Sequence, residues 1–377
     1  MDFTGARAKM SSDSATWVLG LMSGTSMDGV DAALIRTDGR VVFDFGPTLF
    51  RPYGSEERLT LRAALMDARG MTERHERFGH LDEAEAIVTE AHLRVIASLL
   101  LQASGAGITP TAIGFHGQTV LHAPDRGFTV QIGDPVALKE RFGLPVVYDF
   151  RSADVAAGGE GAPLVPVYHR ALAERAELKT PVAILNIGGV ANVTIVGEGD
   201  DMLAFDTGPG NALIDDAVFR VTGAPYDDGG AIAAQGRVDE AAVARLMEHS
   251  YFTEEAPKSI DRNFFSANAV KGLDFADRVA TLTAFTAEAV AAGLRLASQP
   301  VSTVIVAGGG ARNATLLDMI ARRAGVEVKV AGKVGFDADF LEAQAFAFLA
   351  QRRLEGLPST WPRTTGTPKP VVCGEVL

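Results

Sequence analysis

The sequence predicts an α/β fold divided into two related domains. Short apolar runs typical of strands alternate with stretches of helical periodicity, as expected when helices cross over a sheet. The chain has 377 residues, more than one compact core usually accommodates. A strand, a glycine turn and a second strand start at Trp17, and the same pattern starts again at Val182, which indicates a second domain built like the first.

The first half of the chain is predicted to be rich in strands. Its short apolar runs cover residues 17–21, 30–36, 40–50, 111–117, 128–132 and 145–148. Asp38 and Gly39 form the expected hairpin turn between the second and third of these strands. Apolar residues recur every three or four positions between residues 56 and 102, which predicts helix.

A glycine- and proline-rich stretch at residues 158–166 separates the predicted domains. After it we expect strands over 182–187, 193–196 and 303–307, and helices over 274–298 and 341–354. The predicted organisation is an N-terminal domain over residues 17–160 that a C-terminal helix at 341–356 completes, a second domain over 161–340, and a flexible leader over 1–16.

Bulk composition excludes several classes of function. The formal net charge is -12, which argues against a nucleic-acid-binding surface. No run of eighteen apolar residues occurs, and the first sixteen residues lack the apolar core of a signal peptide, so we expect a soluble, cytoplasmic protein without membrane contact. Cys373 is the only cysteine, which excludes an intrachain disulfide and suits a reducing compartment.

Glycines gather at the ends of predicted strands. Four clusters stand out: GLMSGTSMDG at 20–29, NIGG at 186–189, FDTGPGN at 205–211 and GGGARN at 308–313. Glycine lets backbone N–H groups approach an anion closely, and the hydroxyls of Ser23, Thr25 and Ser26 add donors. Each cluster alone is explained by an ordinary tight turn, but four of them after strands favour an ATP site between two domains. The P-loop motif and the dinucleotide-binding motif are both missing.

Seven segments together form a distinctive set. They are GLMSGTSMDGVD (20–31), HGQT (116–119), QIGDP (131–135), DFRSADVAAGGEGAPLVP (149–166), LNIGG (185–189), FDTGPGN (205–211) and GGGARN (308–313). In this order, between residues 17 and 350, they resemble the signature of the anhydro-N-acetylmuramic acid kinase family. The 149–166 segment is the most specific of them, and the glycine turns are less so.

The resemblance implies the fold shared by actin, hexokinases and heat-shock chaperone ATPases. In that fold two related actin-like (ribonuclease H-like) domains flank a central cleft for ATP and substrate. The implied reaction converts 1,6-anhydro-N-acetylmuramic acid, ATP and water into N-acetylmuramic acid 6-phosphate and ADP, which recycles cell-wall sugar. Such a kinase opens the internal glycosidic bond hydrolytically while it phosphorylates. ATP and Mg²⁺ are the implied cofactors, and the anhydro sugar is the small-molecule partner.

Two carboxylates are the candidate catalytic residues. Asp206 ends a predicted strand before a Gly-Pro-Gly turn, and by resemblance it takes the proton from the water that attacks the anomeric carbon. The released oxygen then attacks the γ-phosphate. The alternative is an aspartate that caps the turn. Glu342, at the start of the last predicted helix, is expected to contact substrate or water, or else to be a solvated first-turn glutamate.

Five polar residues are candidate sugar ligands: His116, Gln118, Asp149, Arg151 and Asp154. Arg151 could hold the lactyl carboxylate of the sugar in a bidentate manner, or could pair with Asp154. His116 and Gln118 directly follow an apolar strand, which suits hydrogen bonding to a sugar, although a lone histidine is often a structural hydrogen bonder. No histidines have the spacing of zinc ligands.

The glycine turns supply the candidate ATP ligands. By resemblance these are Gly24, Thr25, Ser26, Met27, Asp28, Gly29, Val30, Asp31, Gly188, Gly189, Gly208, Gly210, Asn211, Gly308, Gly309, Gly310 and Asn313. Residues 308–313 are expected to lie under the adenosine. Related sugar kinases place an aspartate in the first phosphate turn, where this chain has Met22, which cannot bind Mg²⁺. Asp28 is therefore the candidate metal contact, through water.

Two other functions stay open at this point. A relative could keep the ATP site and act on another sugar or acid. A non-catalytic protein could use nucleotide-driven domain closure as its output, as actin and chaperones do. The specific 149–166 segment favours the kinase. The sequence leaves the assembly state open, with a homodimer as one possibility.

Overall fold

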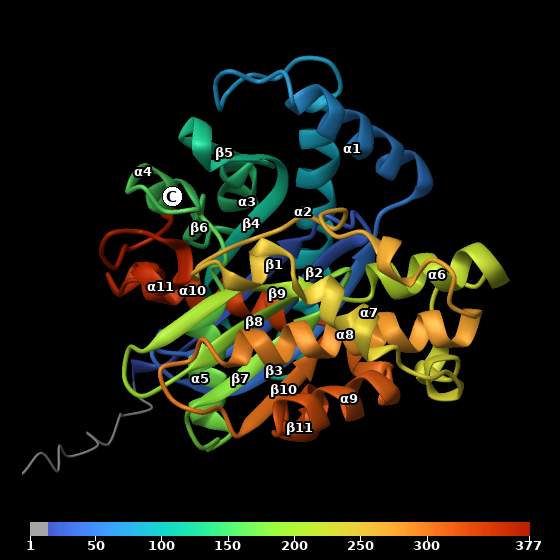
Figure 1. Ribbon diagram of the computed structural model, residues 1–377. Coiled ribbons are helices and arrows are strands. Elements are labelled where there is room, and N and C mark those ends of the chain that lie inside the picture. Colours follow the sequence, from blue (N-terminus) through green and yellow to red (C-terminus); the bar gives the residue numbers. More distant parts are fainter. Residues whose placement is uncertain (1–13) are drawn as a thin grey trace, which may run out of the picture. The chain divides into compact units, whose positions relative to one another are not determined.

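The computed structural model describes residues 14–377, which form two compact units (Figure 1). The first unit contains the chain up to Gly161 together with Phe340–Thr360 and Pro370–Leu377. The second unit contains Ala162–Asp339 and Trp361–Lys369. Most of the predicted leader at 1–16 lies outside the described residues, and its last residue, Thr16, already belongs to a strand.

The first unit is built on a seven-stranded sheet of order β12-β6-β4-β1-β2-β3, with β5 paired to β4. Its strands are β1 (Thr16–Ser23), β2 (Gly29–Thr37), β3 (Val42–Pro52), β4 (Pro110–Ala123), β5 (Phe128–Ile132), β6 (Val146–Tyr148) and β12 (Glu375–Val376). β1, β2 and β3 form an antiparallel meander, and β4 runs parallel to β1 and β6. The predicted turn between β2 and β3 is confirmed, because the Asp38 carboxylate accepts the N–H groups of Arg40 and Val41, each at 2.8 Å.

The helices of the first unit are α1 (Ser55–Ala68), α2 (Leu81–Gly105), α3 (Pro135–Phe142), α4 (Ser152–Ala156) and α10 (Leu341–Leu354), with a 3-10 turn at Pro124–Arg126. The region predicted to be helical between 56 and 102 is interrupted by a loop at 69–80. Gly79, two residues before α2 begins, has a φ of 59°, a left-handed conformation that lies outside helical geometry. This loop carries several basic side chains that matter below.

Helix α10 lies directly against the sheet, on the face opposite α1 and α2. Leu19 and Leu21 of β1 belong to the core that α1 and α2 cover, so Gly20 between them points to the other face. A Cβ atom on Gly20 would lie 1.9 Å from the carbonyl oxygen of Ala343, and Gly114, its neighbour on β4, meets the same helix. The paired glycines therefore allow α10 to approach β1 and β4 closely.

The second unit repeats this plan with a five-stranded sheet of order β11-β10-β7-β8-β9. Its strands are β7 (Val182–Ile187), β8 (Val190–Val196), β9 (Met202–Pro209), β10 (Thr303–Ala307) and β11 (Glu327–Val330). β7, β8 and β9 form the antiparallel meander, and β10 runs parallel to β7 and β11. The predicted α/β class with an actin-like (ribonuclease H-like) strand order is confirmed in both units.

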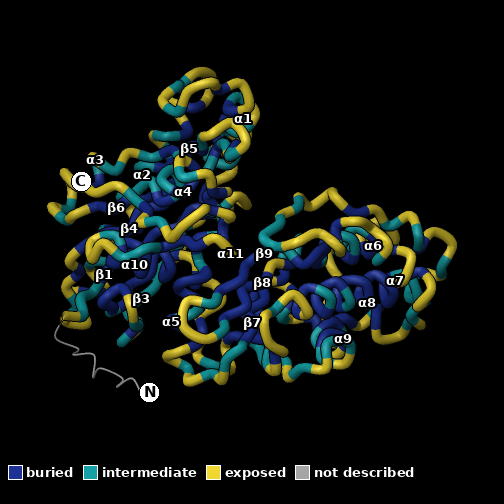
Figure 2. The backbone as a smooth tube through the Cα atoms, turned by 60° about the vertical axis from the view of Figure 1, so that its left-hand side comes forward, coloured by how far each residue is buried: buried dark blue, intermediate teal, exposed yellow. Residues whose placement is uncertain are grey.

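The helices of the second unit are α5 (Pro166–Arg175), α6 (Ala212–Thr222), α7 (Glu240–Met247), α8 (Phe275–Leu294), α9 (Ala314–Ala324) and α11 (Pro362–Thr365). Short 3-10 helices lie at Asp228–Gly230, Ala233–Gln235, Ser250–Thr253, Ala267–Val270, Gly309–Arg312 and Ala331–Val334. The predicted helix over 274–298 is α8, which ends at Leu294, ahead of Pro300. Figure 2 shows α8 as mostly buried, consistent with its alanine-rich sequence.

Several elements escaped sequence analysis, among them the helices α3, α4, α5 and α7. The elements β11, β12 and α11 were also missed, because each has at most four residues, too few to show a periodic pattern. Within residues 14–377, no helix combines the length and the apolar character that crossing a membrane requires.

Candidate active site

Asp206 lies within β9 and not at its end. The predicted strand end at Asp206 is wrong, because β9 continues to Pro209 and keeps pairing with β8. Asn192 pairs with Asp206 whereas Ala191 pairs with Gly208, so Thr207 is an extra residue on β9, a β-bulge. Bulges redirect neighbouring side chains and occur often beside active sites.

Three contacts hold Asp206 to the segment 251–260. Its backbone N–H donates to the carbonyl oxygen of Lys258 at 3.0 Å, and the N–H of Ile260 donates to its carboxylate Oδ2 at 2.9 Å. The Tyr251 hydroxyl donates to the Asp206 carbonyl oxygen. The Lys258 ammonium group donates to the Tyr251 carbonyl oxygen at 2.6 Å, which closes the segment on itself. Sequence analysis missed these residues, because an irregular segment shows no local signal of a distant contact.

The environment of Asp206 suits a proton acceptor. Burial raises the pKa of this carboxyl to about 6, and the hydrogen bond from Ile260 lowers it in part. The carboxylate receives no N–H from the turn that follows it and forms no ion pair with another described residue. It is therefore ionised at neutral pH yet poorly stabilised, which makes it more basic than an exposed aspartate.

The glycine turns after β7 and β9 are locked together in the second unit. The N–H of Gly210 donates to the carbonyl oxygen of Gly189 at 3.0 Å, and that of Asn211 donates to Gly188 at 2.7 Å. A Cβ atom on Gly210 would lie 2.3 Å from the Gly188 carbonyl oxygen, so this contact requires glycine. Gly208 is buried, and a Cβ on it would lie 2.9 Å from a side chain of α8.

The turn after β10 joins the other two. A Cβ atom on Gly308 would lie 2.4 Å from the side-chain oxygen of Asn186 on β7. Asn313 caps α9 by accepting the N–H of Leu316 at 2.9 Å. Gly230, which sequence analysis missed, packs against the same Asn313, since a Cβ on it would lie 2.2 Å from Oδ1. Three of the predicted ATP turns thus lie side by side, while Gly309 is exposed at their surface.

The first turn of the first unit is open at its tip and buried at its base. The exposed or partly exposed candidates there are Gly24, Thr25, Ser26, Asp28 and Asp31. The buried ones are Met27, Gly29 and Val30. Only the backbone of these buried residues could face a nucleotide, whereas the hydroxyls and carboxylates of the tip are accessible.

A buried polar network supports this turn from below. The Ser23 hydroxyl donates to the Gln118 side-chain oxygen at 2.6 Å and lies 2.9 Å from the Tyr53 hydroxyl. Burial raises the pKa of Tyr53 to about 12, so the hydroxyl keeps its proton. The predicted sugar ligand Gln118 therefore lies beneath the turn that follows β1, with its amide oxygen engaged.

His116 and Arg151 form a buried pair in the first unit. Arg151 donates from Nε to His116 Nε2 at 3.1 Å, and His116 Nδ1 lies 2.9 Å from the Gly117 carbonyl oxygen. Nδ1 must then carry the proton, and the imidazole is neutral. Burial, and next the Arg151 charge, hold the His116 pKa well below its usual range. Both ring nitrogens are engaged within the protein, which leaves His116 to orient Arg151.

Glu342 lies within the electrostatic field of Arg151. It is the second residue of α10 and keeps an exposed surface, so solvent reaches its side chain. Loss of part of its hydration raises the pKa of Glu342, while the Arg151 charge lowers it. Burial lowers the Arg151 pKa to about 10, and the charges of Glu342 and Asp154 counteract this effect. The guanidinium stays protonated at neutral pH and stabilises the Glu342 carboxylate.

Asp149 and Asp154 hold the 149–161 part of the specific segment in a compact loop. Asp149 has a φ of 49°, an unfavourable left-handed conformation for a residue other than glycine, and its carboxylate accepts the Arg74 guanidinium at 2.6 Å. The buried Asp154 carboxylate accepts the N–H of Gly161 at 2.7 Å. A Cβ atom on Gly159 would lie 2.2 Å from that carboxylate, so only glycine fits.

A cavity of about 150 Å³ opens in the first unit beside these residues. Its lining includes the predicted ligands His116 and Asp149 together with Arg74, Gln131 and Tyr148. Sequence analysis missed Arg74, because the loop at 69–80 carries no motif. Within residues 14–377, no group of three His, Cys, Asp or Glu side chains is arranged to hold a metal ion.

Comparison with known proteins decides the family. The family model described as "Anhydro-N-acetylmuramic acid kinase" matches residues 16–377. The chain belongs to this family. The resemblance seen in the seven sequence segments is thus confirmed over nearly the whole chain. The chain is accordingly an enzyme, a kinase of the anhydro-N-acetylmuramic acid kinase family.

Individual members of the anhydro-N-acetylmuramic acid kinase family are close in sequence. The anhydro-N-acetylmuramic acid kinase of Rhodopseudomonas palustris (strain BisB18) is 52% identical over 359 residues, which cover 95% of this chain and 98% of that protein. The one from Azorhizobium caulinodans is 54% identical over 364 residues, 94% of this chain and 97% of that protein. Among solved structures, the xylulose kinase of Rhodospirillum rubrum is 12% identical with a TM-score of 0.46, covering 87% of this chain and 92% of that chain.

Proposed function

We propose that this chain converts 1,6-anhydro-N-acetylmuramic acid, ATP and water into N-acetylmuramic acid 6-phosphate and ADP. Asp206 takes a proton from water as the water oxygen bonds to the anomeric carbon. The bond between that carbon and the bridging oxygen breaks, and the bridging oxygen attacks the γ-phosphorus as ADP leaves. One water is consumed per ATP, and the proton on Asp206 is released to solvent before the next turnover.

The observation that carries the proposal is the environment of Asp206. A general base works best when its pKa lies near the working pH. Burial brings the pKa of Asp206 to about 6, and the contacts to Lys258 and Ile260 hold the carboxylate in one orientation. The residue stands in the FDTGPGN segment of the family signature, next to the turn at Gly210 and Asn211.

The second carboxylate of the proposed mechanism is Glu342. Its accessible side chain beside the fixed charge of Arg151 suits a contact with the sugar or the attacking water. The separation of two carboxylates by a sugar and a water is typical of inverting glycosidases. His116 serves in this proposal as a positioning residue, since both of its nitrogens are engaged and one of them orients Arg151.

The turns after β7, β9 and β10 are the proposed ATP-binding surface of the second unit, with residues 308–313 under the adenosine. The first unit contributes the turn that carries Thr25, Ser26 and Asp28. Mg²⁺ keeps several waters and takes one or two carboxylates besides the nucleotide phosphates, so the single exposed carboxylate of Asp28 fits it. When bound, Mg²⁺ neutralises charge on the β- and γ-phosphates.

A cytoplasmic location belongs to the same proposal. ATP is the phosphate donor, and the lone Cys373 is buried, with a pKa that burial raises to about 12, so it stays a thiol. Fractionation of cells that produce the protein, followed by detection in the cytosolic fraction, tests this location.

The decisive experiment measures ADP release by purified protein with and without the anhydro sugar. We expect ADP to form only when the sugar is present, in equal amounts with N-acetylmuramic acid 6-phosphate. Equal ADP release in both cases would support a nucleotide-gated ATPase instead. Sugar-dependent ADP release with a different sugar, but none with 1,6-anhydro-N-acetylmuramic acid, would support a relative with a changed substrate.

A further inference from the structure

We propose that Arg74 recognises the lactyl carboxylate of the sugar, and that the cavity in the first unit holds this arm of the substrate. The inference rests on the proposed function and assigns a residue for substrate specificity within it. The cavity, of about 150 Å³, is several times the ~30 Å³ that a water molecule occupies in the liquid, so it admits a small substituent.

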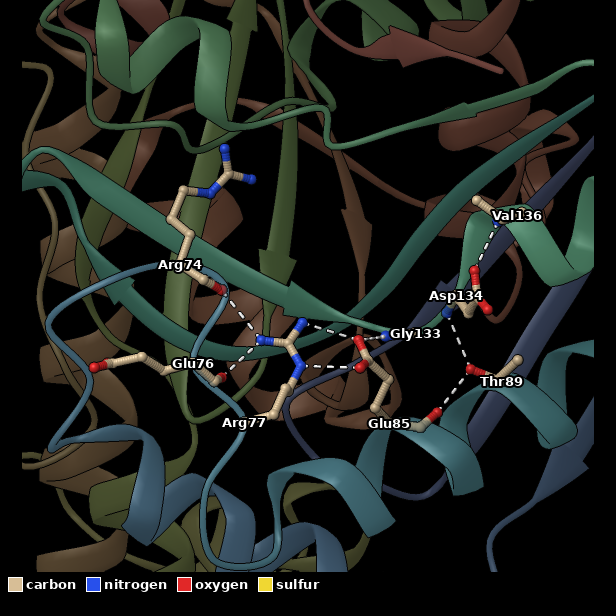
Figure 3. A network of polar contacts seen from close by, with 8 residues as sticks. All are labelled: Arg74, Glu76, Arg77, Glu85, Thr89, Gly133, Asp134 and Val136. Atoms are coloured by element: carbon tan, nitrogen blue, oxygen red, sulfur yellow. Dashed lines mark hydrogen bonds and ion pairs between the residues drawn. The ribbon is translucent and has the colours of Figure 1, made fainter.

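The loop that carries Arg74 is held in place by Arg77 (Figure 3). Arg77 donates from Nε and Nη2 to the two carboxylate oxygens of Glu85, both at 2.9 Å. Its Nη1 donates to the carbonyl oxygens of Arg74 at 3.1 Å and Glu76 at 2.9 Å. Glu85 also accepts the N–H of Gly133, which fixes the loop to the end of β5. Every side-chain nitrogen of Arg77 is thus engaged in folding the loop, and none is left for a ligand.

Arg74 differs from Arg77 in what its guanidinium contacts. Figure 3 shows its side chain pointing away from the Arg77 guanidinium. Nη2 donates to Asp149 Oδ2 at 2.6 Å, and among the described residues neither Nε nor Nη1 has an acceptor. The side chain is 36% exposed, whereas that of Asp149 is 8% exposed. The buried Asp149 carboxylate therefore anchors the guanidinium and leaves most of its N–H donors for an incoming acceptor.

Gln131 adds an acceptor to the same cavity. Its Nε2 donates to the hydroxyl oxygens of Thr129 at 2.9 Å and Thr119 at 3.3 Å. The Thr129 hydroxyl in turn donates to the Leu121 carbonyl oxygen at 3.2 Å, so it must accept from Gln131, which settles the orientation of the amide. The Gln131 Oε1 atom is buried without a donor. Such an atom favours a ligand that brings an N–H or O–H group.

The chemistry of the cavity matches a carboxylated, N-acetylated sugar. Arg74 offers a cationic donor, which pairs with carboxylates through charge-assisted hydrogen bonds. Gln131 offers the acceptor that an acetamido N–H or a sugar hydroxyl requires. His116 lines the same cavity and accepts a hydrogen bond from Arg151, whose charge acts on Glu342, so a chain of interactions links the cavity to Glu342.

Arg151, the carboxylate ligand expected from the sequence, has fewer unoccupied guanidinium nitrogens than Arg74. Its Nε donates to His116 and its Nη1 to the Gly161 carbonyl oxygen at 2.8 Å. A bidentate fork needs two adjacent nitrogens, and two of the three in Arg151 are already occupied. We therefore assign carboxylate recognition to Arg74 and keep Arg151 beside Glu342.

The test compares two ligands, 1,6-anhydro-N-acetylmuramic acid and 1,6-anhydro-N-acetylglucosamine, which lacks the lactyl group. Their affinities for wild-type protein and for Arg74→Gln are measured by titration calorimetry with a non-hydrolysable ATP analogue present. We expect Arg74→Gln to lower the affinity for the muramic sugar by about 10- to 100-fold, the range for a hydrogen bond to a charged group. The affinity for the neutral sugar should fall by less than about threefold. Arg74→Lys keeps the charge and is expected to restore part of the difference. Arg69→Gln, at an exposed arginine just after α1, is the matched control and should change neither affinity.

The outcomes separate this inference from the proposed function. Equal losses of affinity for both sugars in Arg74→Gln would overturn it, because Arg74 would then act only in stabilising the fold. Equal wild-type affinities for the two sugars would also overturn it, because the lactyl carboxylate would contribute nothing. Wild-type protein that binds neither sugar would remove the proposed function itself. Thermal unfolding of each variant is measured first, and Arg74→Lys carries the comparison if Arg74→Gln is unstable.

Discussion

In the first unit, Arg74 and Asp149 form an ion pair that lines a cavity, whereas in the second unit Asp206 is largely buried and forms no ion pair with another described residue. Asp149 anchors Arg74, and Glu342 lies in the field of Arg151. The Asp206 carboxylate, in contrast, accepts one N–H group, and burial raises its pKa to about 6. An anchored guanidinium is suited to the recognition of an acceptor, whereas a buried carboxylate without a nearby opposite charge gains basicity.

The two units have the same strand order but position their carboxylates by different elements. In the first, the paired glycines Gly20 and Gly114 let α10, whose second residue is Glu342, lie close to β1 and β4. In the second, a bulge beside Asp206 and the irregular segment 251–260 place the carboxylate. One site is therefore positioned by a helix and the other by a loop, and each can be disturbed separately.

The strongest test of the comparison is Asp206→Asn. We expect turnover to fall by at least about 10²-fold, because the base is lost, and ATP affinity to change by less than about threefold, because the nucleotide turns keep their contacts. The melting temperature at pH 7.5 should not fall, since the substitution removes a charge that is costly to bury. Turnover is measured as sugar-dependent ADP release. Asp318→Asn, on the surface of α9, is the control, and near-normal turnover of Asp206→Asn would remove the role assigned to the second unit.

Gly20→Ala tests whether α10 packs closely against the sheet of the first unit. The added methyl would lie 1.9 Å from the carbonyl oxygen of Ala343, so the helix has to move. We expect the free energy of unfolding in urea to fall by about 1–3 kcal/mol, as for other overpacked cores. Gly105→Ala is the control, because nothing lies within 4 Å of a Cβ there and alanine suits the end of a helix better than glycine. Equal stability of the two variants would show that α10 is not pressed against the sheet.

The smallest expected effect concerns the hydrogen bond from Tyr251 that helps to hold Asp206 in place. With its pKa at about 6, only the ionised form acts as a base, so kcat/KM should fall on the acidic side of pH 6 and level off above it. Tyr251→Phe removes the hydroxyl that bonds the Asp206 carbonyl oxygen while it keeps the ring. We expect turnover to fall by about 2- to 10-fold. The acidic midpoint should move to lower pH, because a looser segment admits water and lessens the desolvation that raises the pKa.

The control for Tyr251→Phe is Tyr226→Phe, at a tyrosine that is 56% exposed. Its pH profile should match that of the wild type. A Tyr251→Phe profile with the wild-type midpoint and turnover would show that the backbone bonds to Lys258 and Ile260 hold the carboxylate on their own.

Much of the fold could be predicted because its signals are local. The apolar run at 17–21, the hairpin at Asp38 and the periodic helix α8 each depend on neighbours within a few residues. The strand end at Asp206 was predicted wrongly, because the pairing that extends β9 comes from β8 and not from the local sequence. The short strands β11 and β12 were missed because pairing partners, and not periodicity, define them.

The sequence by itself determined the α/β class, the family signature and the residue types that could carry the chemistry. Only the tertiary structure decided how those residues are used. Ile260 reaches Asp206 across 54 positions and Arg74 reaches Asp149 across 75, and no local pattern records such a contact. Because pKa, orientation and free hydrogen-bond donors depend on these distant neighbours, the basicity of Asp206 and the roles proposed for His116 and Arg74 follow from packing and not from sequence spacing.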